Sequence, residues 1–348
     1  MYKSSQNKLN VFGELSDWCA KADFRGLAKC FPSPNQLTVA HEKNHMLSSL
    51  QKTVLVISSN YPWNKTIGLL QRIYQPYFGV TIFCGSWYPD RYVDEVGFPK
   101  LQKPFNYIHL SASEMTRGYY AYYCLAKAKE LRIQGTTGYF IMADDTTFNF
   151  WNEVNLSTVF HPNGLGHNGN AHWWGSAVGL KAAKAAVKLF KEKYRNDTAA
   201  QRIWKQFHDD YQPEKGTPGN VSEFMTEGDG WSVSDLYYVP SSLLEYHAGL
   251  MEVFFEGKLF HEIAISKFLH CVVHKSLNST QYDLLYGKGG RGAWHRNYHE
   301  KLYMMHPIKF SRFKNADTRR LFCTTVLSTF ERNLLKINKQ EQGNNTVA

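Results

Sequence analysis

The chain lacks any apolar run long enough to cross a membrane. A spanning helix needs roughly 18 or more consecutive apolar residues, and the richest stretch, residues 251–273, is broken by charged and histidine side chains. The first 50 residues also lack the apolar core of a secretory signal peptide. We therefore expect no transmembrane span in these 348 residues, although the N-terminus could be truncated or an alternative start.

The six cysteines are scattered and include no Cys-x-x-Cys pair, which argues against a zinc site or a thioredoxin motif. Cys84 and Cys124 lie in apolar segments, and we interpret them as buried thiols. Cys19 and Cys30 could form a disulfide, and the sequence leaves this open.

The chain also lacks an excess of acidic residues, and its net charge is +10. From Lys288 to the C-terminus, 12 Lys and Arg stand against four Asp and Glu. Such basic stretches attract nucleic acid, anionic lipid or phosphorylated ligands, or they form a solvated helix. No RNP, zinc-finger or helix-turn-helix pattern occurs, so we do not expect nucleic acid as a partner.

Six Asn-x-Ser/Thr triplets give a weak indication of the compartment. The motif is short and occurs by chance, but an excess favours a secretory compartment. The missing signal peptide favours the cytoplasm instead, so both remain open. The triplets begin at Asn64, Asn155, Asn196, Asn220, Asn278 and Asn344.

Regular alternation of strands and helices begins at Thr53. We predict strands at 53–58, 80–84, 107–110 and 138–145, and helices at 65–77 and 113–133, the second capped by Ser111 or Ser113. This order implies an α/β fold with a mixed, mostly parallel sheet flanked by helices.

The second half is less regular. We predict helices at 177–194, 196–210, 241–255 and 262–273, a strand at 236–239 and a terminal basic helix at 317–338. We divide the chain into an N-terminal extension (1–50), a regular α/β half (51–155), a less regular half of the same domain (156–310) and a basic C-terminal helix and tail (311–348).

Two adjacent aspartates end the most informative strand. In residues 138–145, apolar and aromatic side chains precede Asp144 and Asp145, and the carboxyl ends of strands in an open α/β sheet form its ligand-binding edge. Two carboxylates there repel each other unless a hard divalent cation lies between them. The structural alternative is a helix cap paired with a lysine. The aromatic side chains of 148–151 could stack on a ligand ring.

At this strand the sequence resembles the GT-A glycosyltransferases, which use nucleotide-sugar donors. In that fold the last strand of a Rossmann-like half ends in an acidic D-x-D motif that holds Mn²⁺ or Mg²⁺. Residues 143–145, Ala-Asp-Asp, form an x-D-D variant that lacks the first acid. The resemblance covers residues 53–310, and the closest named group is the STELLO-like glycosyltransferases. It implies a GT-A-like fold, a metal held by Asp145 and Asp144, and a nucleotide-sugar donor. Residues 51–155 would then be the nucleotide-sugar-binding half, and residues 156–310 the acceptor and metal-completing half.

The resemblance also assigns donor-binding roles. Ser58, Ser59 and Asn60 follow the first predicted strand, where GT-A enzymes bind the nucleotide base and ribose. Arg117 resembles the arginine of an Arg-Asn segment that contacts the nucleotide in that family. A guanidinium and a helix N-terminus both favour phosphate, although an exposed helix-face charge is the structural alternative. Asp144 would support the metal or contact the ribose.

A late histidine is a further metal ligand in many GT-A enzymes, with a basic side chain nearby on the diphosphate. His306 follows a predicted apolar strand at 302–305, and Lys309 lies three residues further on. Neutral imidazole is a competent ligand for Mn²⁺. A lone histidine is more often a surface or core residue, and His295 and His299 are alternative ligands.

Sugar transfer usually needs a carboxylate base to deprotonate the acceptor hydroxyl. Glu262 opens a predicted apolar helix, where the helix dipole also stabilises a carboxylate. Asp235, just before the predicted strand at 236–239, and Asp229 are the alternatives. Trp231 and the aromatic residues of 172–175 could line an acceptor site or pack in the core. A retaining mechanism would need no base.

Two other functions stay open. A metal-dependent phosphohydrolase would also place acids at strand ends, but it normally needs more acids or a nucleophilic Asp near the first strand, and residues 58–61 offer none. A non-catalytic scaffold is compatible with the missing first acid. The family resemblance and the Asn-x-Ser/Thr triplets favour the Golgi or another secretory compartment. The donor sugar and the acceptor are not determined by the sequence.

Overall fold

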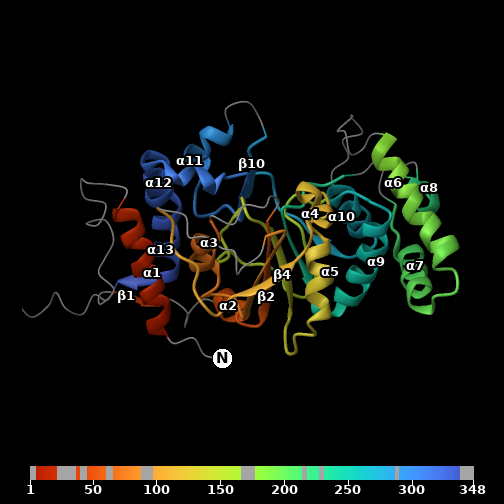
Figure 1. Ribbon diagram of the computed structural model, residues 1–348, viewed down its shortest axis with the longest axis horizontal. Coiled ribbons are helices and arrows are strands. Elements are labelled where there is room, and N and C mark those ends of the chain that lie inside the picture. The colour runs from red at the N-terminus through yellow and green to blue at the C-terminus, as the bar shows by residue number, and fades with distance from the viewer. Residues whose placement is uncertain are drawn as a thin grey trace, which may run out of the picture.

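A seven-stranded sheet in the order β4-β3-β2-β5-β8-β7-β9 forms the centre of the protein (Figure 1). We describe it from a computed structural model. The described residues are 5–21, 37–39, 45–59, 66–87, 97–165, 177–213, 218–226, 231–286 and 290–337.

The sheet is mixed and mostly parallel, as predicted. Its first four strands run parallel to one another, β8 is antiparallel to β5, and the short strands β7 and β9 are parallel to each other. The predicted α/β fold is therefore confirmed, and it is compatible with a GT-A-like fold. The strands are β2 (Thr53–Ser58), β3 (Val80–Gly85), β4 (Asn106–His109), β5 (Gly138–Ala143), β7 (Val159–Phe160), β8 (Leu236–Pro240) and β9 (His274–Lys275).

Both faces of the sheet are covered, which explains why its central strands are apolar without interruption. Along β2, Leu55 and Ile57 pack into one core and Val54 and Val56 into the other. Burying apolar surface on both sides is what holds the parallel strands in place. One core contains α2 (His45–Leu50) and α3 (Ile67–Tyr74), and the other contains α5 (Tyr123–Glu130), α9 (Leu244–Glu256) and α10 (His261–Leu269).

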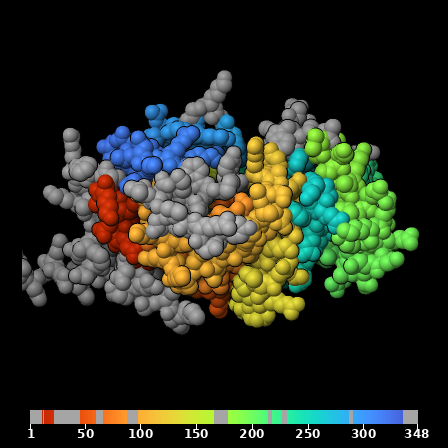
Figure 2. Space-filling view, viewed as in Figure 1, coloured from red at the N-terminus to blue at the C-terminus, as the bar shows by residue number. Residues whose placement is uncertain are grey.

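Three further helices lie at the end of the molecule beyond α9, shown in green in Figures 1 and 2. Amphipathic α7 buries Ala200, Trp204 and Phe207 and leaves its charged side chains in solvent. These helices are α6 (Ala177–Lys188), which continues into a π-helix (Leu189–Lys193), α7 (Thr198–Asp210) and α8 (Val221–Thr226).

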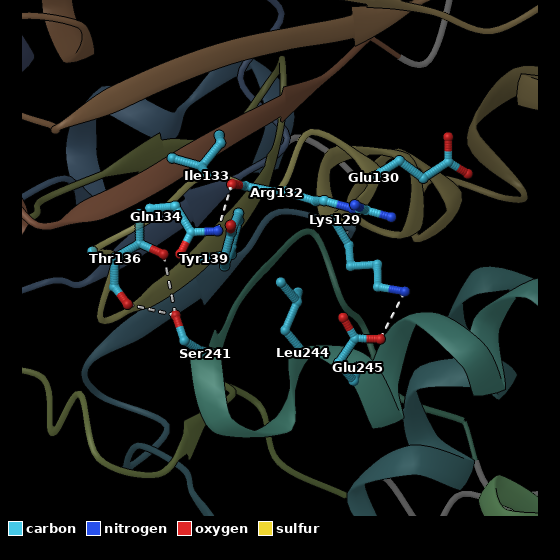
Figure 3. Close-up of a pocket in the computed structure, with 11 residues that line it drawn as sticks. Lys129, Glu130, Arg132, Ile133, Gln134, Thr136, Tyr139, Ser241, Leu244 and Glu245 are labelled. Carbon is cyan, nitrogen blue, oxygen red and sulfur yellow. Dashed lines mark hydrogen bonds and ion pairs between the residues drawn. The ribbon is translucent and has the colours of Figure 1, made fainter. Parts of the chain in front are cut away.

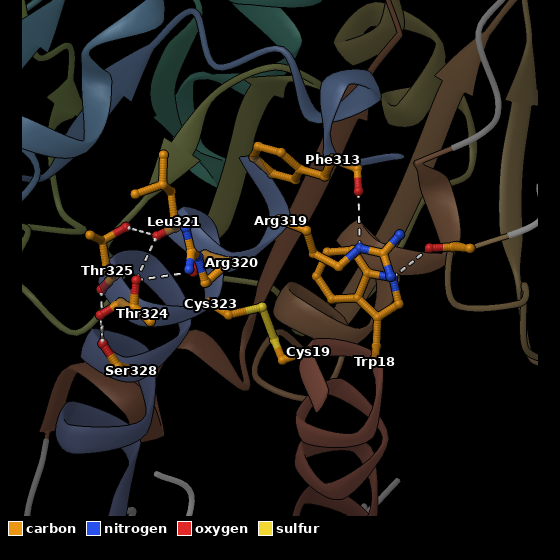
Figure 4. The surroundings of a disulfide bond; sticks show 11 residues. Trp18, Cys19, Phe313, Arg319, Arg320, Leu321, Cys323, Thr324, Thr325 and Ser328 are labelled. Atoms are coloured by element: carbon orange, nitrogen blue, oxygen red, sulfur yellow. Dashed lines mark hydrogen bonds between the residues drawn. A yellow bond between two sulfur atoms is a disulfide. The ribbon is translucent and has the colours of Figure 1, made fainter. Parts of the chain in front are cut away.

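The described N-terminal and C-terminal segments lie together at the opposite end of the molecule, where Figure 2 shows red and blue segments side by side. Strand β1 (Leu37–Val39) pairs antiparallel with β12 (Leu335–Ile337). A disulfide between Cys19 and Cys323 joins helix α1 to the C-terminal helices (Figure 4). The helices here are α1 (Ser5–Ala20), α12 (Ala316–Phe322), a π-helix (Cys323–Leu327) and α13 (Ser328–Leu334). The predicted helix at 317–338 is therefore interrupted, and the proposed four-part division of the chain stays a prediction.

The prediction of one long helix at 113–133 is wrong. It is split into α4 (Ala112–Met115), a 3₁₀ turn (Thr116–Gly118) and α5. Thr116, Arg117 and Gly118 have φ angles of 38°, 58° and 91°, in the left-handed region that an α-helix excludes. The predicted cap is correct at Ser111, whose side chain and that of Glu114 form a capping box.

The cysteine interpretation is also wrong. Cys84 and Cys124 form a second disulfide rather than staying as thiols. Cys19 pairs with Cys323 and not with Cys30, which lies outside the described residues. Pairing across 304 positions of sequence depends on the folded chain, so spacing did not reveal it.

Removing the Cys19–Cys323 disulfide with a Cys19→Ala/Cys323→Ala variant is expected to destabilise the protein by about 2–5 kcal/mol, because the cross-link restricts the unfolded chain. Urea unfolding under non-reducing conditions measures this. The control is Cys271→Ala, which alters a buried cysteine that has no disulfide. Equal unfolding midpoints for the double variant and the wild type would contradict the pairing.

Candidate active site

A small three-stranded sheet brings together the two ends of the predicted metal site. Strand β6 (Thr147–Phe148) begins one residue after the aspartate pair and pairs antiparallel with β11 (Met304–His306). Strand β11 also pairs with β10 (Tyr282–Leu284). The amide of Ile308 donates to the carbonyl of Asp145 over 2.6 Å. The chain therefore folds back so that His306 and Lys309 lie beside Asp145.

Asp145 is 7% exposed and has a partner on each carboxylate oxygen. Its Oδ1 lies 3.1 Å from Nε2 of His306, and its Oδ2 pairs with the ammonium of Lys309. Burial alone would raise the pKa of Asp145, but the two cationic partners outweigh burial and hold that pKa well below its usual range. The structure therefore brings Asp145, His306 and Lys309 into contact, as the sequence predicted.

The other side of the His306 ring faces a second carboxylate. Its Nδ1 lies 3.2 Å from Oδ2 of Asp235 and 3.1 Å from the hydroxyl of Tyr286. Burial alone would lower the pKa of His306, but Asp235 and Asp145 outweigh it and raise the pKa above its usual value. Neither His295 nor His299 has a described contact with Asp145.

Two of the predicted ligands fit a shared cation. Ligands about 2.1 Å from one ion at a right angle stand roughly 3 Å apart, and Oδ1 of Asp145 is 3.1 Å from Nε2 of His306. Within the described residues, no group of three or more His, Cys, Asp or Glu side chains is arranged to hold a metal. A cation here would therefore need oxygens from water and substrate phosphate, as Mg²⁺ and Mn²⁺ commonly do.

A cavity of about 100 Å³ opens between the carboxyl ends of β2 and β5 and the start of α10. It joins residues that the sequence analysis assigned to donor binding with residues assigned to catalysis. Its lining residues are Ser58, Arg117, Gly118, Tyr119, Ala121, Ile141, Ala143, Ser234, Asp235, His261 and Glu262.

Glu262 lies in the first turn of α10, where the helix dipole would lower its pKa. The opposite shift is found, because burial and the neighbouring Asp235 carboxylate raise the pKa of Glu262 to about 7. A carboxyl group that titrates near neutral pH suits general base catalysis.

Two buried histidines hold the residue before Asp235. Nε2 of His161 lies 3.0 Å from the hydroxyl of Ser234, and Nε2 of His261 lies 2.9 Å from the carbonyl of Ser234. The carbonyl of Asp235 accepts a hydrogen bond from the amide of Ala143 in β5. Hydrogen bonds to the Asp235 carbonyl and to Ser234 thus hold the backbone at Asp235 in place.

The structure describes all but one of the residues predicted to bind the donor. Ser58 and Ser59 are buried at the end of β2, and the hydroxyl of Ser59 has no hydrogen-bond partner among the described residues. The amide of Asp144 donates to the carbonyl of Ser58, and its side chain is partly exposed. Arg117 is exposed on the left-handed turn, not on a continuous helix. Asn60 lies outside the described residues.

The aromatic and acidic residues expected near a ligand ring or the acceptor are buried, partly buried or outside the described residues. The aromatic run at 148–151 is not available to stack on a ligand, because Phe148, Phe150 and Trp151 are buried in the core. Trp231 is partly buried. Asp229 and residues 172–175 lie outside the described residues.

Tyr286 was missed by the sequence analysis. Its hydroxyl contacts both Asp235 and His306, although half of the residue is exposed. The only sequence signal was an aromatic residue at the start of a glycine-rich loop. Its partners in space are Asp235, just before β8, and His306, at the end of β11. Only the parallel pairing of β10 with β11 brings it there.

A larger cavity, of about 710 Å³, lies elsewhere (Figure 3). It is bounded by the end of α5, the start of β5 and the start of α9, and the ion pair of Lys129 with Glu245 crosses it. Because β5 runs from this cavity to the aspartates and rises about 3.3 Å per residue, the cavity is at the wrong edge of the sheet for the predicted chemistry.

Comparison with known families supports the recognition made from the sequence. The family model for STELLO glycosyltransferases matches residues 1–236. That range includes Asp144, Asp145 and Arg117 and ends before Glu262 and His306. No curated protein matches the chain. None of the described helices combines the length and the apolar character that a membrane span requires.

The neutral state of His161 predicts acid sensitivity. Burial lowers the pKa of His161 to about 3, against about 6.5 when unfolded. The unfolded chain therefore binds the proton first, and stability falls by about 1.4 kcal/mol per pH unit as the pH drops from 6.5 towards 3. Urea unfolding at several pH values should give a shallower pH dependence for His161→Gln. An unchanged slope would contradict the buried neutral histidine.

Proposed function

The chain belongs to the STELLO glycosyltransferase family, and from this premise we propose that it transfers a sugar from a nucleotide-diphosphate donor to an acceptor hydroxyl with the help of Mn²⁺ or Mg²⁺. The observation that carries the proposal is the contact between Asp145 and His306 at the carboxyl edge of the sheet. Open α/β sheets bind their ligands at this edge.

In the proposed complex, Asp145 and His306 would hold the cation, and the donor diphosphate would supply further oxygen ligands. A bound cation neutralises charge on the leaving diphosphate. Lys309 is partly exposed and pairs with Asp145. When the donor binds, its ammonium would leave that carboxylate and pair with a phosphate of the donor. Arg117, which lines the cavity, would supply a guanidinium to the diphosphate. Ser58 of the same lining, with the adjacent Ser59 and with Asp144, would border the nucleoside.

Glu262 is the proposed base. Its carboxylate takes the proton of the acceptor hydroxyl while the acceptor oxygen bonds to the anomeric carbon and the bond from that carbon to the diphosphate breaks. The pKa of Glu262, about 7, supports this role because both protonation states are accessible at neutral pH. This assignment describes an inverting transfer.

The disulfides and the Asn-x-Ser/Thr triplets support a secretory location. Disulfides persist in oxidising compartments, and two join the described residues. The four described asparagines of the triplets are all exposed, as glycosylation requires: Asn155, Asn196, Asn220 and Asn278. We therefore propose the lumen of the secretory pathway, with the Golgi favoured by the family resemblance.

The metal requirement is tested by titrating UDP into the protein calorimetrically, with Mn²⁺ and then with EDTA. Mn²⁺ is expected to strengthen binding by about tenfold or more, and Asp145→Ala should abolish the difference. The control is Asp317→Ala, which removes an exposed carboxylate far along the chain. Equal UDP binding with and without Mn²⁺, or by Asp145→Ala, would count against metal-assisted donor binding.

The base is tested through hydrolysis of sugar nucleotides, in which water replaces the acceptor. Glu262→Gln is expected to lower turnover by about 100-fold or more without weakening UDP binding. Wild-type turnover should rise as the pH passes 7 and Glu262 loses its proton. Glu252→Gln, another carboxyl group whose pKa burial raises, is the matched control. A loss equal to that of the control would remove Glu262 from the mechanism.

A further inference from the structure

His306 lies between two carboxylates, and each one faces a different ring nitrogen. Asp145 lies at Nε2 and Asp235 at Nδ1, at 3.1 and 3.2 Å. The hydroxyl of Tyr286 is 3.1 Å from Nδ1 and 3.3 Å from the same oxygen of Asp235. The three groups on the Nδ1 side therefore form a closed triangle away from the proposed cation position.

With a cation at Nε2 in place of the proton shared with Asp145, this arrangement would hold the tautomer that a metal ligand needs. Nε2 can bind a cation only if its lone pair is free, which places the ring proton on Nδ1. A carboxylate that accepts this proton in a hydrogen bond holds the ring orientation and makes the other nitrogen a better ligand. Asp235 is in the position to do so, and the Tyr286 hydroxyl can donate to the same carboxylate.

We propose that Asp235 is a positioning residue, which orients His306 for cation binding with the help of Tyr286, and is not the base of the reaction. This rests on the proposed function, because it assigns roles within that metal site. It also gives the two carboxylates of the cavity different roles. Asp235 acts through the histidine, and Glu262, which forms no hydrogen bond or ion pair with His306 among the described contacts, is left for the acceptor.

The backbone supports this division. Asp235 is fixed by its own carbonyl, which accepts from Ala143, and by Ser234, which His161 and His261 hold. Its side chain is 19% exposed, so it borders the cavity while its Oδ2 is turned towards the ring. A rigid support of this kind is what precise orientation of a metal ligand requires.

Mn²⁺ affinity in the presence of saturating UDP and no acceptor separates the two roles. Asp235→Ala is expected to bind Mn²⁺ about 10–100-fold more weakly, and Tyr286→Phe more weakly by a smaller factor. Glu262 lines the same cavity, and the Glu262→Gln variant should bind Mn²⁺ as tightly as the wild type does. The electron-spin-echo signal of imidazole nitrogen on Mn²⁺ should be present in the wild type and reduced in Asp235→Ala.

Metal rescue gives a second readout. Asp235→Asn keeps the size of the side chain, so it decides the question if Asp235→Ala fails to fold. Its sugar-nucleotide hydrolysis should recover as Mn²⁺ is raised, whereas that of Glu262→Gln should not. Wild-type Mn²⁺ affinity and nitrogen signal retained in the Asp235 variants would overturn the inference. Failure of the wild type itself to bind Mn²⁺ with UDP would instead contradict the proposed function.

Discussion

The pairing of β6 with β11 is the constraint on which the candidate site depends. It joins the segment after the aspartates to the segment that ends at His306, although about half of the chain separates them. Phe148, Met304 and Met305 are buried in the same core, so apolar packing holds the pairing. Without it, the buried carboxylate of Asp145 would lose both cationic partners, at a cost of several kcal/mol.

The same constraint gives the site two different sides. On one side, Asp145, His306 and Lys309 carry charges suited to a cation and a diphosphate. On the other, Asp235 and Glu262 border a small cavity with Arg117. His306 belongs to both, because each ring nitrogen faces one side. The chemistry proposed for the cavity therefore depends on how the histidine is held.

Local patterns predicted the longer strands of the central sheet, because a buried strand is apolar over a short, continuous run, but they missed the short strands β6, β7, β9 and β10. The strand at 53–58 was placed without error, and Asp145, His306 and Lys309 were grouped correctly. What failed depends on contacts between distant segments. The Cys19–Cys323 disulfide and the Tyr286 contacts have no local signal. The left-handed turn at Arg117 also escaped, because helix propensity does not show where tertiary packing breaks a helix.

The central claim is that Asp145 and His306 hold a divalent cation that binds the donor diphosphate. The most direct test is anomalous X-ray diffraction from crystals of the protein with Mn²⁺ and UDP. The account predicts a manganese peak within coordination distance, about 2.1–2.3 Å, of Asp145 Oδ1 and His306 Nε2, with a phosphate oxygen as a further ligand. An ordered UDP at the sheet edge with no manganese between these two side chains would contradict it.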